Sequence, residues 1–435
     1  MQILAFGVYA CMLVFSVLIY RKFSNPFVLF NFIWMFLIGV SCIGYFGIET
    51  TSDQVYRTFL IGGVACNLLG LLLSFVRGVL FQRVPTFKRK IFLNDRFKKR
   101  LMLFLQLAIA VYYVVKGVML VRYLLSGGAY SEVRKRYFSA EYLSSNAEYL
   151  ALVYIIDPIV LVTEIVFSLN MVKRQYSVFS LLVMLFNIVM RAAVSGGRMI
   201  LFELVLLVIF SLLLNKQNRT WLSSGVKALL VVGAGAVGAV NITAGRTGNR
   251  NIGFFATIAE TIAVNFTGSF KYYSILDQWS RFASSSNGRS VLAGLFDPFI
   301  SLGRFLGLTD AVTAQNEIGN LLADFYTIGD YSFNAMPTMY YFFQTDFGNA
   351  GPVFAGICLA LILFFAYRNH RTQGTEKSFA YYLLALLVLL ESPMIWLPFR
   401  SSFVMAVFYT ALLVSNQSLA SPSGTNSDFA REEQV

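Results

Sequence analysis

The sequence predicts an all-α integral membrane protein that crosses the bilayer many times. Hydrophobic residues make up 57% of the 435 positions and charged residues only 13%, which leaves too little polar surface for a water-soluble chain of this length. The apolar residues gather in runs of about twenty, the length that a helix needs to cross the hydrocarbon core. We therefore expect about eleven spans and one large external loop that contains interfacial helices.

Apolar runs separated by short polar breaks define the expected spans. These are 2–20, 26–48, 58–80, 101–122, 149–170, 177–193, 199–214, 224–242, 350–367, 378–396 and 402–416. The first run has no basic residue before it and no small-residue cleavage site after it, so we expect an uncleaved span rather than a signal peptide. The chain then divides into a first membrane bundle of about eight spans (1–242), a large external loop (243–345), C-terminal membrane helices (346–416) and a polar, disordered cytoplasmic tail (417–435).

Basic residues in the short loops set the orientation. The 81–100 loop is densely basic and holds one acid, Asp95, so the positive-inside tendency places this loop in the cytoplasm. Alternation then puts the N-terminus outside and the C-terminus inside. The segments on the external side are 49–57, 123–148, 194–198, 243–345 and 397–401.

The large external loop is basic although it lies on the side that disfavours positive charge. Its cations are Arg246, Arg250, Lys271, Arg281, Arg289 and Arg304. We interpret them as a site for an anionic ligand. Arg246 and Arg250 lie four residues apart among glycines and asparagines, where they can wrap a pyrophosphate; a solvated loop pair is the alternative.

Other classes of site find little support. The four cysteines all fall inside apolar runs and lack the spacing of metal ligands. The net charge of +13 flanks spans and forms no basic domain, so nucleic acid is not an expected partner. The sole histidine, His370, lies in a cytoplasmic loop. A base on the external side would therefore be a carboxylate, such as Glu317, Asp324 or Asp330, or no side chain at all.

The segment VSGGRMILFEL (194–204) places Arg198 where a span re-enters the membrane. Two glycines allow a tight turn, and the following helix N-terminus favours anions. An arginine beside such a terminus can bind phosphate. An arginine whose charged end reaches the lipid headgroups explains the segment equally well.

Two further external segments have competing interpretations. NAMPTMYYFFQTDFGNAGPVF (334–354) carries Tyr340 and Tyr341, whose rings can stack on sugars or simply form the aromatic belt at the membrane surface. ESPMIWLPFRSSF (391–403) carries Glu391 and Arg400, which form either a structural pair or part of a catalytic site.

Four ionisable residues lie in or near apolar runs. They are Lys116, Asp157, Glu164 and Glu203. Ionisable side chains inside a membrane are functional candidates, and an ion-coupled transporter would need them. Here they are scattered along the sequence, and no internal repeat accompanies them.

Three segments in a fixed order resemble the Wzy-type oligosaccharide repeat-unit polymerases of O-antigen, capsule and enterobacterial common antigen. They are SGGR at the start of a span, the large external loop that ends in MPTMYYFFQTDFGNAG, and PFRSSF before the last span. The resemblance implies a GT-C-like inverting glycosyltransferase of lipopolysaccharide or capsule biosynthesis. Such an enzyme lies in the bacterial cytoplasmic (inner) membrane, with its active site facing the periplasm or exterior.

The resemblance also implies the chemistry. A growing glycan leaves its undecaprenyl-pyrophosphate carrier and joins a new lipid-linked repeat unit, and neither a metal nor another cofactor is required. The basic positions of the polymerase family correspond to Arg198 and Arg400 in this sequence. We expect these two arginines to be catalytic, together with Asp324 as the base. Expected contacts to substrate or pyrophosphate come from Arg191, Arg246, Arg250, Arg289, Arg304, Tyr340 and Tyr341.

The expected partners are the lipid-linked oligosaccharide, as both donor and acceptor, and membrane lipids; a chain-length regulator is a further candidate. Two other functions remain open. An O-antigen ligase uses the same donor, but the ligase family has a histidine in its large external loop, and this loop has none. A lipid-linked oligosaccharide flippase or transporter would have shorter and more uniform loops.

Overall fold

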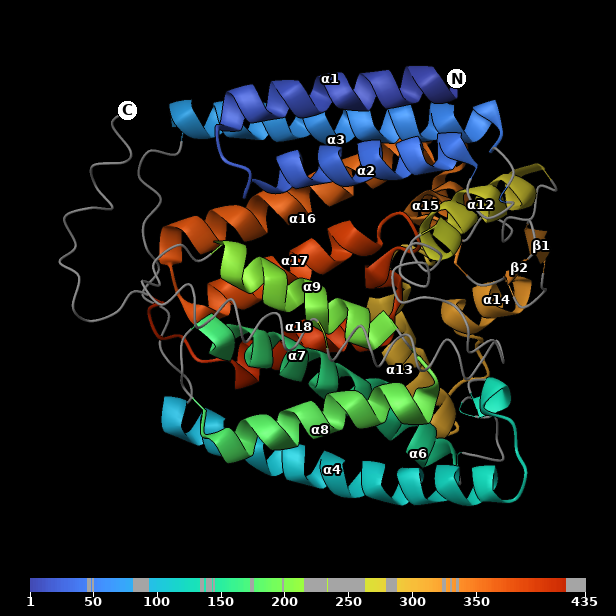
Figure 1. Ribbon diagram of the computed structural model, residues 1–435, viewed down its shortest axis with the longest axis vertical. Coiled ribbons are helices and arrows are strands. Elements are labelled where there is room, and N and C mark those ends of the chain that lie inside the picture. The colour runs from blue at the N-terminus through green and yellow to red at the C-terminus, as the bar shows by residue number, and fades with distance from the viewer. Residues whose placement is uncertain are drawn as a thin grey trace.

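The computed structural model describes residues 1–44, 48, 51–80, 94–133, 137, 143, 145–172, 176–197, 199–214, 233, 263–278, 288–322, 326–328, 331–333 and 336–419. Long helices run side by side along one direction, and short helices with a small two-stranded ribbon gather at one end of them (Figure 1). We call this end the loop end. The arrangement confirms a mostly helical, membrane-embedded protein.

Within the described ranges, seven helical stretches are long and apolar enough to cross a membrane. They are Gln2–Tyr20, Pro26–Ile43, Asp53–Val76, Asp95–Leu125, Asn146–Val172, Val178–Ser195 and Met339–Gln373. Two shorter apolar helices, Met199–Leu214 and Ser401–Leu413, occupy expected spans. The expected span 224–242 lies outside the described residues except for Gly233. Several spans are thus confirmed, whereas a total of about eleven stays a prediction.

The N-terminal half supplies helices α1 to α9. Their bounds are α1 Gln2–Tyr20, α2 Pro26–Ile43, α3 Asp53–Leu80, α4 Asp95–Leu125, α6 Asn146–Ala151, α7 Asp157–Val172, α8 Val178–Ser195 and α9 Met199–Leu214. A 3-10 turn (Tyr130–Glu132) follows α4, and a π-helical turn (Leu152–Ile156) joins α6 to α7. α2 ends earlier than its expected span because Gly44, at φ 67°, adopts the left-handed conformation that closes a helix.

The C-terminal half supplies the short elements and three further long helices. Their bounds are α12 Gly268–Gln278, preceded by a π-helical turn (Ala263–Thr267), α13 Ala293–Phe305, α14 Ala314–Leu321, β1 Tyr326–Ile328, β2 Tyr331–Phe333, α15 Met339–Phe347, α16 Gly351–Gln373, α17 Glu376–Glu391 and α18 Ser401–Leu413. The strands pair antiparallel, with Tyr326 opposite Phe333. Short 3-10 turns precede α16 (Gly348–Ala350) and α18 (Leu397–Phe399).

α17 is the central helix of the bundle. Its sequence is apolar on nearly every side, the pattern of a helix that is buried all round. It packs against α2, α7, α9, α16 and α18, and Figure 1 shows it in the middle of the layer of long helices. Thr375 and Ser378 form a capping box at its start. Because the helix ends at Glu391, it delivers a carboxylate to the interior of the loop end.

Close packing joins α3 to α16. A Cβ atom added at Gly356 of α16 would lie 2.2 Å from the carbonyl oxygen of Gly62 on α3, so the two backbones touch. Small residues permit such contact between membrane helices. Polar side chains join α2 to α3 as well: the amides of Asn31 and Asn67 donate to each other at 2.9 Å.

The large loop, where we expect interfacial helices, contains α12 and α13. α13 exposes apolar side chains such as Phe299 and Phe305 (70% and 53% exposed), which suits a helix at the membrane surface. α12, in contrast, packs into the bundle, where its Phe270 stacks on Trp34 with 5.7 Å between ring centroids. It buries most of its side chains there rather than lying over the surface.

Two buried aspartates fasten this loop. Asp346 accepts from the backbone N–H groups of Ser290 and Val291 at 3.2 and 2.7 Å. Asp297 accepts from the backbone N–H groups of Ala314 and Gln315, at the start of α14. Burial raises the pKa of Asp297, and these two donors oppose the shift.

The start of the expected tail is ordered. The carbonyl of Gln417 accepts from the backbone N–H of Glu376, and Ser418 forms a bridge with Thr375. Residues 420–435 lie outside the described residues.

Replacing Gly356 by Val should destabilise the protein by about 1–3 kcal/mol or more, because the new side chain must force α16 away from the α3 backbone. Gly7→Val is the matched control, since a Cβ added at Gly7 meets nothing within 4 Å. Unfolding of both variants in detergent measures the difference. Equal losses of stability in the two variants would contradict the proposed contact.

Candidate functional site

Ionisable side chains that are far apart in the sequence converge inside the loop end. We call the set the polar cluster: Asp157 and Glu164 of α7, Arg191 of α8, Glu203 of α9, Glu391 of α17 and Arg400, which precedes α18. Their charges interact with one another. Charged groups are costly inside a membrane protein, so a set that persists there is a candidate functional site.

Arg191 connects α8 to two carboxylates of α7. Its Nε lies 3.0 Å from Asp157 Oδ1, and its Nη1 lies 3.8 Å from Glu164 Oε1. Asp157 and Glu164 are seven residues apart and share a helix face, so one guanidinium reaches both. The charge of Arg191 is therefore already balanced by protein.

Burial of the polar cluster increases along α7, from Asp157 to Glu164. Arg191 and Asp157 keep 17% and 18% of their side-chain surface exposed, whereas Glu164 has none. Among the described residues, neither carboxylate oxygen of Glu164 has a hydrogen-bond partner, and the same holds for the buried hydroxyl of Tyr113, whose electrostatic neighbours include Asp157 and Arg191. Seven residues of helix correspond to about 10 Å. The polar cluster thus extends from Asp157, which is partly exposed, to Glu164, which is fully buried.

A local irregularity sets the position of Asp157. The π-helical turn Leu152–Ile156 directly precedes it, and Pro158 follows. Proline lacks the backbone N–H that a regular helix needs, and single π turns inside helices often mark functional sites. The turn changes the rotation of the chain immediately before the acid that meets Arg191.

Glu391, Glu203 and Arg400 form the other half of the polar cluster. The charges of Glu203 and Arg400 both act on Glu391, and α9, which carries Glu203, packs against α17. Glu391 is 2% exposed, while Glu203 and Arg400 are half-buried. Among the described residues, Arg400 makes no ion pair within 4.0 Å and no side-chain hydrogen bond. It thus differs from Arg191 in having a guanidinium that no neighbouring carboxylate holds.

The turn that carries Arg400 is held firmly. Trp396 donates from Nε1 to the carbonyl of Val291 at 3.1 Å, and the rings of Phe399 and Phe342 lie 4.6 Å apart. The backbone N–H of Met339 donates to the carbonyl of Ser392. These contacts tie the 392–400 turn to the large loop on one side and to α15 on the other.

The remaining intramembrane cation has a structural partner. Lys116 of α4 lies 2.5 Å from Glu148 Oε1 of α6, and the hydroxyl of Tyr112 donates to the same oxygen at 3.2 Å. Both charges of the pair are largely buried. This group accounts for Lys116 without a ligand.

Four of the expected site residues fall outside the described residues: Arg198, Arg246, Arg250 and Asp324. Arg289 and Arg304 are exposed. Arg289 donates to the carbonyl of Val312 at 2.9 Å and lies 3.9 Å from Glu317 Oε2, so it braces the loop between α13 and α14. Their roles in binding pyrophosphate stay predictions.

Tyr340 and Tyr341 are fully buried. The ring of Tyr340 packs edge-on against Trp34 and also lies 5.5 Å from Phe59. Both tyrosines thus belong to the core at the start of α15, and in this structure neither presents a ring face to solvent. Stacking of these rings on a sugar stays a prediction.

Sequence reasoning named every member of the polar cluster but did not predict their meeting. Glu203 and Glu391 lie almost two hundred residues apart, and neither has a neighbour in sequence that announces the other. The signal that was available is that each is an acid in or beside an apolar run.

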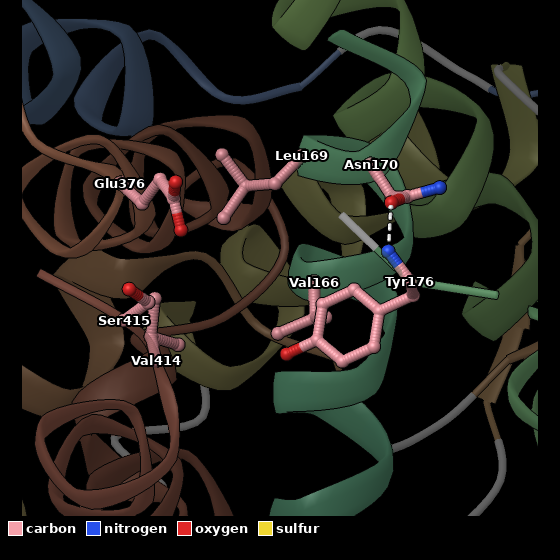
Figure 2. A pocket seen from close by; sticks show the side chains of 7 residues that line it. All are labelled: Val166, Leu169, Asn170, Tyr176, Glu376, Val414 and Ser415. Carbon is pink, nitrogen blue, oxygen red and sulfur yellow. Dashed lines mark hydrogen bonds between the residues drawn. The ribbon is translucent and has the colours of Figure 1, made fainter. Parts of the chain in front are cut away.

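A pocket at the opposite end of the bundle is lined by Val166, Leu169, Asn170, Tyr176, Glu376, Val414 and Ser415 (Figure 2). Asn170 Oδ1 accepts from the backbone N–H of Tyr176 at 2.9 Å. Burial raises the pKa of the Tyr176 hydroxyl, and the charge of Glu376 adds to the shift. The space holds about one water molecule, so we regard it as a packing defect between helix ends.

Replacing Arg191 by Gln should destabilise the protein by about 3–5 kcal/mol, because Asp157 and Glu164 then lose the charge that compensates them. Arg57→Gln serves as the control, since Arg57 is an exposed arginine at the same end of the bundle. Denaturant titration in detergent gives both free energies of unfolding. Adding Glu164→Gln to Arg191→Gln should recover part of the loss; no recovery would mean that charge is not the cause.

Comparisons of the chain with family models, with curated proteins and with solved structures find no match. The structural argument for a function therefore rests on the polar cluster and on the fold that positions it.

Proposed function

We propose that this protein is an inverting, GT-C-like polysaccharide polymerase of the bacterial cytoplasmic membrane. It transfers a growing glycan from undecaprenyl pyrophosphate to a new lipid-linked repeat unit, as the resemblance to the Wzy-type polymerases implies. The loop end would face the periplasm or exterior, in agreement with the charge of the short loops. The product would be O-antigen, capsule or a related surface glycan.

The observation that carries the proposal is the environment of Arg400. Arg400 is half-buried, its charge acts on the carboxyl groups of Glu391 and Asp157, and its guanidinium makes no ion pair with a described residue. Arginine binds phosphate through two parallel hydrogen bonds and keeps its charge at any physiological pH. A partly buried, unpaired arginine is therefore suited to a pyrophosphate whose negative charge grows as it leaves.

The carboxyl groups beside Arg400 supply a second requirement of glycosyl transfer. The acceptor hydroxyl must lose a proton as it attacks the anomeric carbon, and a nearby carboxylate can accept it. The electrostatic interaction between Arg400 and Glu391 supports the proposal, because the reaction needs both an anion-binding group and a proton-accepting group.

The same convergence also favours a second function, an ion-coupled transporter of lipid-linked oligosaccharide. Buried carboxylates in a membrane bundle are typical of proton and ion pathways. Their gathering from α7, α9 and α17 removes the objection that they are scattered along the sequence. The fate of the lipid-linked glycan distinguishes the two functions.

Deletion of the gene should leave surface lipid that carries single repeat units and no long glycan. The lipid-linked unit is still made and still crosses the membrane, but it is not extended. Gel separation of the surface glycan shows the difference. Complete loss of surface glycan would instead support the transporter.

Complementing that deletion with Arg400→Ala should fail to restore long glycan, with a loss of rate of about 100-fold or more if the arginine stabilises the leaving group. Arg400→Lys should restore part of it, because charge is kept and the bidentate contact is lost. Arg57→Ala, at equal protein level in the membrane, controls for loss of an arginine at the same end. Full polymerisation by Arg400→Ala would overturn the assignment of Arg400.

A further inference from the structure

The placement of Arg400 depends on its backbone. Among the described residues its guanidinium makes no ion pair and no side-chain hydrogen bond, so no partner there fixes its charged end. The residue has an extended backbone, with φ −80° and ψ 123°, at the N-cap of α18. Its carbonyl oxygen accepts from the backbone N–H groups of Phe403 and Val404 at 3.1 and 3.2 Å. The contacts that hold this turn therefore decide where the guanidinium lies.

Gly294 brings the backbone of α13 against this turn. A Cβ atom added at Gly294 would lie 2.2 Å from the carbonyl oxygen of Pro398 and 2.9 Å from that of Arg400. Both atoms belong to the backbone, which cannot rotate aside as the end of a side chain can. Gly294 lies inside α13, where alanine would suit the helical backbone better than glycine. The close approach to the Arg400 turn, and not the helix itself, therefore requires glycine at this position.

α14 holds the residue that follows Arg400. Gln315 donates from Nε2 to the hydroxyl oxygen of Ser401 at 2.5 Å, and Ser401 is fully buried. Because Ser401 is the first residue of α18, this hydrogen bond acts on the helix start from which the Arg400 side chain extends. The large loop thus contacts two successive residues of the turn, one through the backbone of α13 and the other through a side chain of α14.

Hydrogen bonds also hold α13 in place. Asp297 of α13, which is 2% exposed, accepts from the backbone N–H groups of Ala314 and Gln315 at 3.0 and 2.8 Å, and so ties α13 to α14. The hydroxyl of Tyr154, in the π-helical turn before α7, donates to the hydroxyl oxygen of Ser301 in α13 at 2.7 Å. These bonds oppose a retreat of α13. A side chain added at its contact with the turn would therefore displace the turn.

We propose that Gly294 and Gln315 are positioning residues, which hold the guanidinium of Arg400 where the leaving pyrophosphate gains negative charge; this assignment rests on the proposed polymerase function. Neither residue needs to touch the substrate, because both act through the backbone of the turn. A displacement of about 1 Å at a reacting group can lower a rate about 100-fold. The large external loop thus forms part of the anion site through its contacts with the residues that carry the arginine.

The test measures polymerisation by the full-length protein in lipid vesicles, with lipid-linked repeat units extracted from the deletion strain. Gly294→Ala should lower the rate constant at saturating substrate by about 10–100-fold and change KM by about two-fold or less, because the contact of Arg400 with the leaving group strengthens in the transition state. Gly319→Ala is the matched control. Gly319 lies in α14 of the same loop, and a Cβ added there meets nothing within 4 Å, so its rate should equal that of the wild type.

Gln315→Met tests the second contact and decides the proposal if Gly294→Ala does not fold. It removes the donor and keeps the length of the side chain, so the rate constant should fall. Ser401→Ala should lower the rate by a similar factor, and the double variant should lose no more than either single variant, because both changes break the same hydrogen bond. A wild-type rate in Gly294→Ala or in Gln315→Met would overturn the assignment of that residue.

The Arg400→Ala background separates positioning from a general loss of structure. In that background Gly294→Ala should cause no further loss of the residual rate, because no guanidinium remains to be misplaced. A further loss by the same factor as in the wild type would show that Gly294 acts independently of Arg400, and would overturn the proposal.

Modification by phenylglyoxal, which reacts with arginine side chains, gives a readout that does not depend on catalysis. The rate at which Arg400 is modified, followed by mass spectrometry, should change several-fold in Gly294→Ala and stay at the wild-type value in Gly319→Ala. Equal rates in all three proteins would contradict the contact. If the wild-type protein extends no lipid-linked unit, the polymerase function fails as a separate result, and the modification rates still decide whether α13 positions Arg400.

Discussion

The cost of holding charge inside a membrane bundle governs the arrangement of the loop end. Arg191 lies against Asp157 and Glu164, and removing water from any one of these groups without a partner would cost several kcal/mol. The pairing therefore fixes α8 against α7 in one rotation and one depth. Because α7 also packs on α17 and α18, the same contact positions the helices that carry Glu391 and Arg400.

α17 imposes the second constraint. A helix that is apolar all round can lie only where other helices cover it, so α17 occupies the centre and its two glutamates are buried at opposite ends. The glutamate at the start has a capping box and the ordered beginning of the tail around it. The glutamate at the end, Glu391, instead experiences the charges of Glu203 and Arg400. α17 thus carries one glutamate, Glu376, among contacts that stabilise the fold and another, Glu391, in the polar cluster.

The sequence predicts the bounds of individual helices better than the contacts between them. Hydropathy locates α1 and α9 at their observed bounds, because apolar runs end sharply at charged or polar residues. It extends α17 too far, because the residue before Pro393 is disfavoured in a helix and the helix ends at Glu391. It does not predict that the ring of Tyr340 packs in the core against Trp34. Periodicity along one chain carries no information on which helix covers which ring.

The two described arginines of the polar cluster show why position in sequence is a weak guide to role. Arg191 and Arg400 lie at the same end of the bundle and both border carboxylates. Arg191 forms ion pairs with Asp157 and Glu164 of α7. An incoming phosphate would have to compete with these two acids. The charge of Arg400 acts on Glu391 and Asp157, but among the described residues no carboxylate lies within 4.0 Å of its guanidinium. Arg400 is therefore less neutralised, and a pyrophosphate placed there gains more from the contact than it would at Arg191.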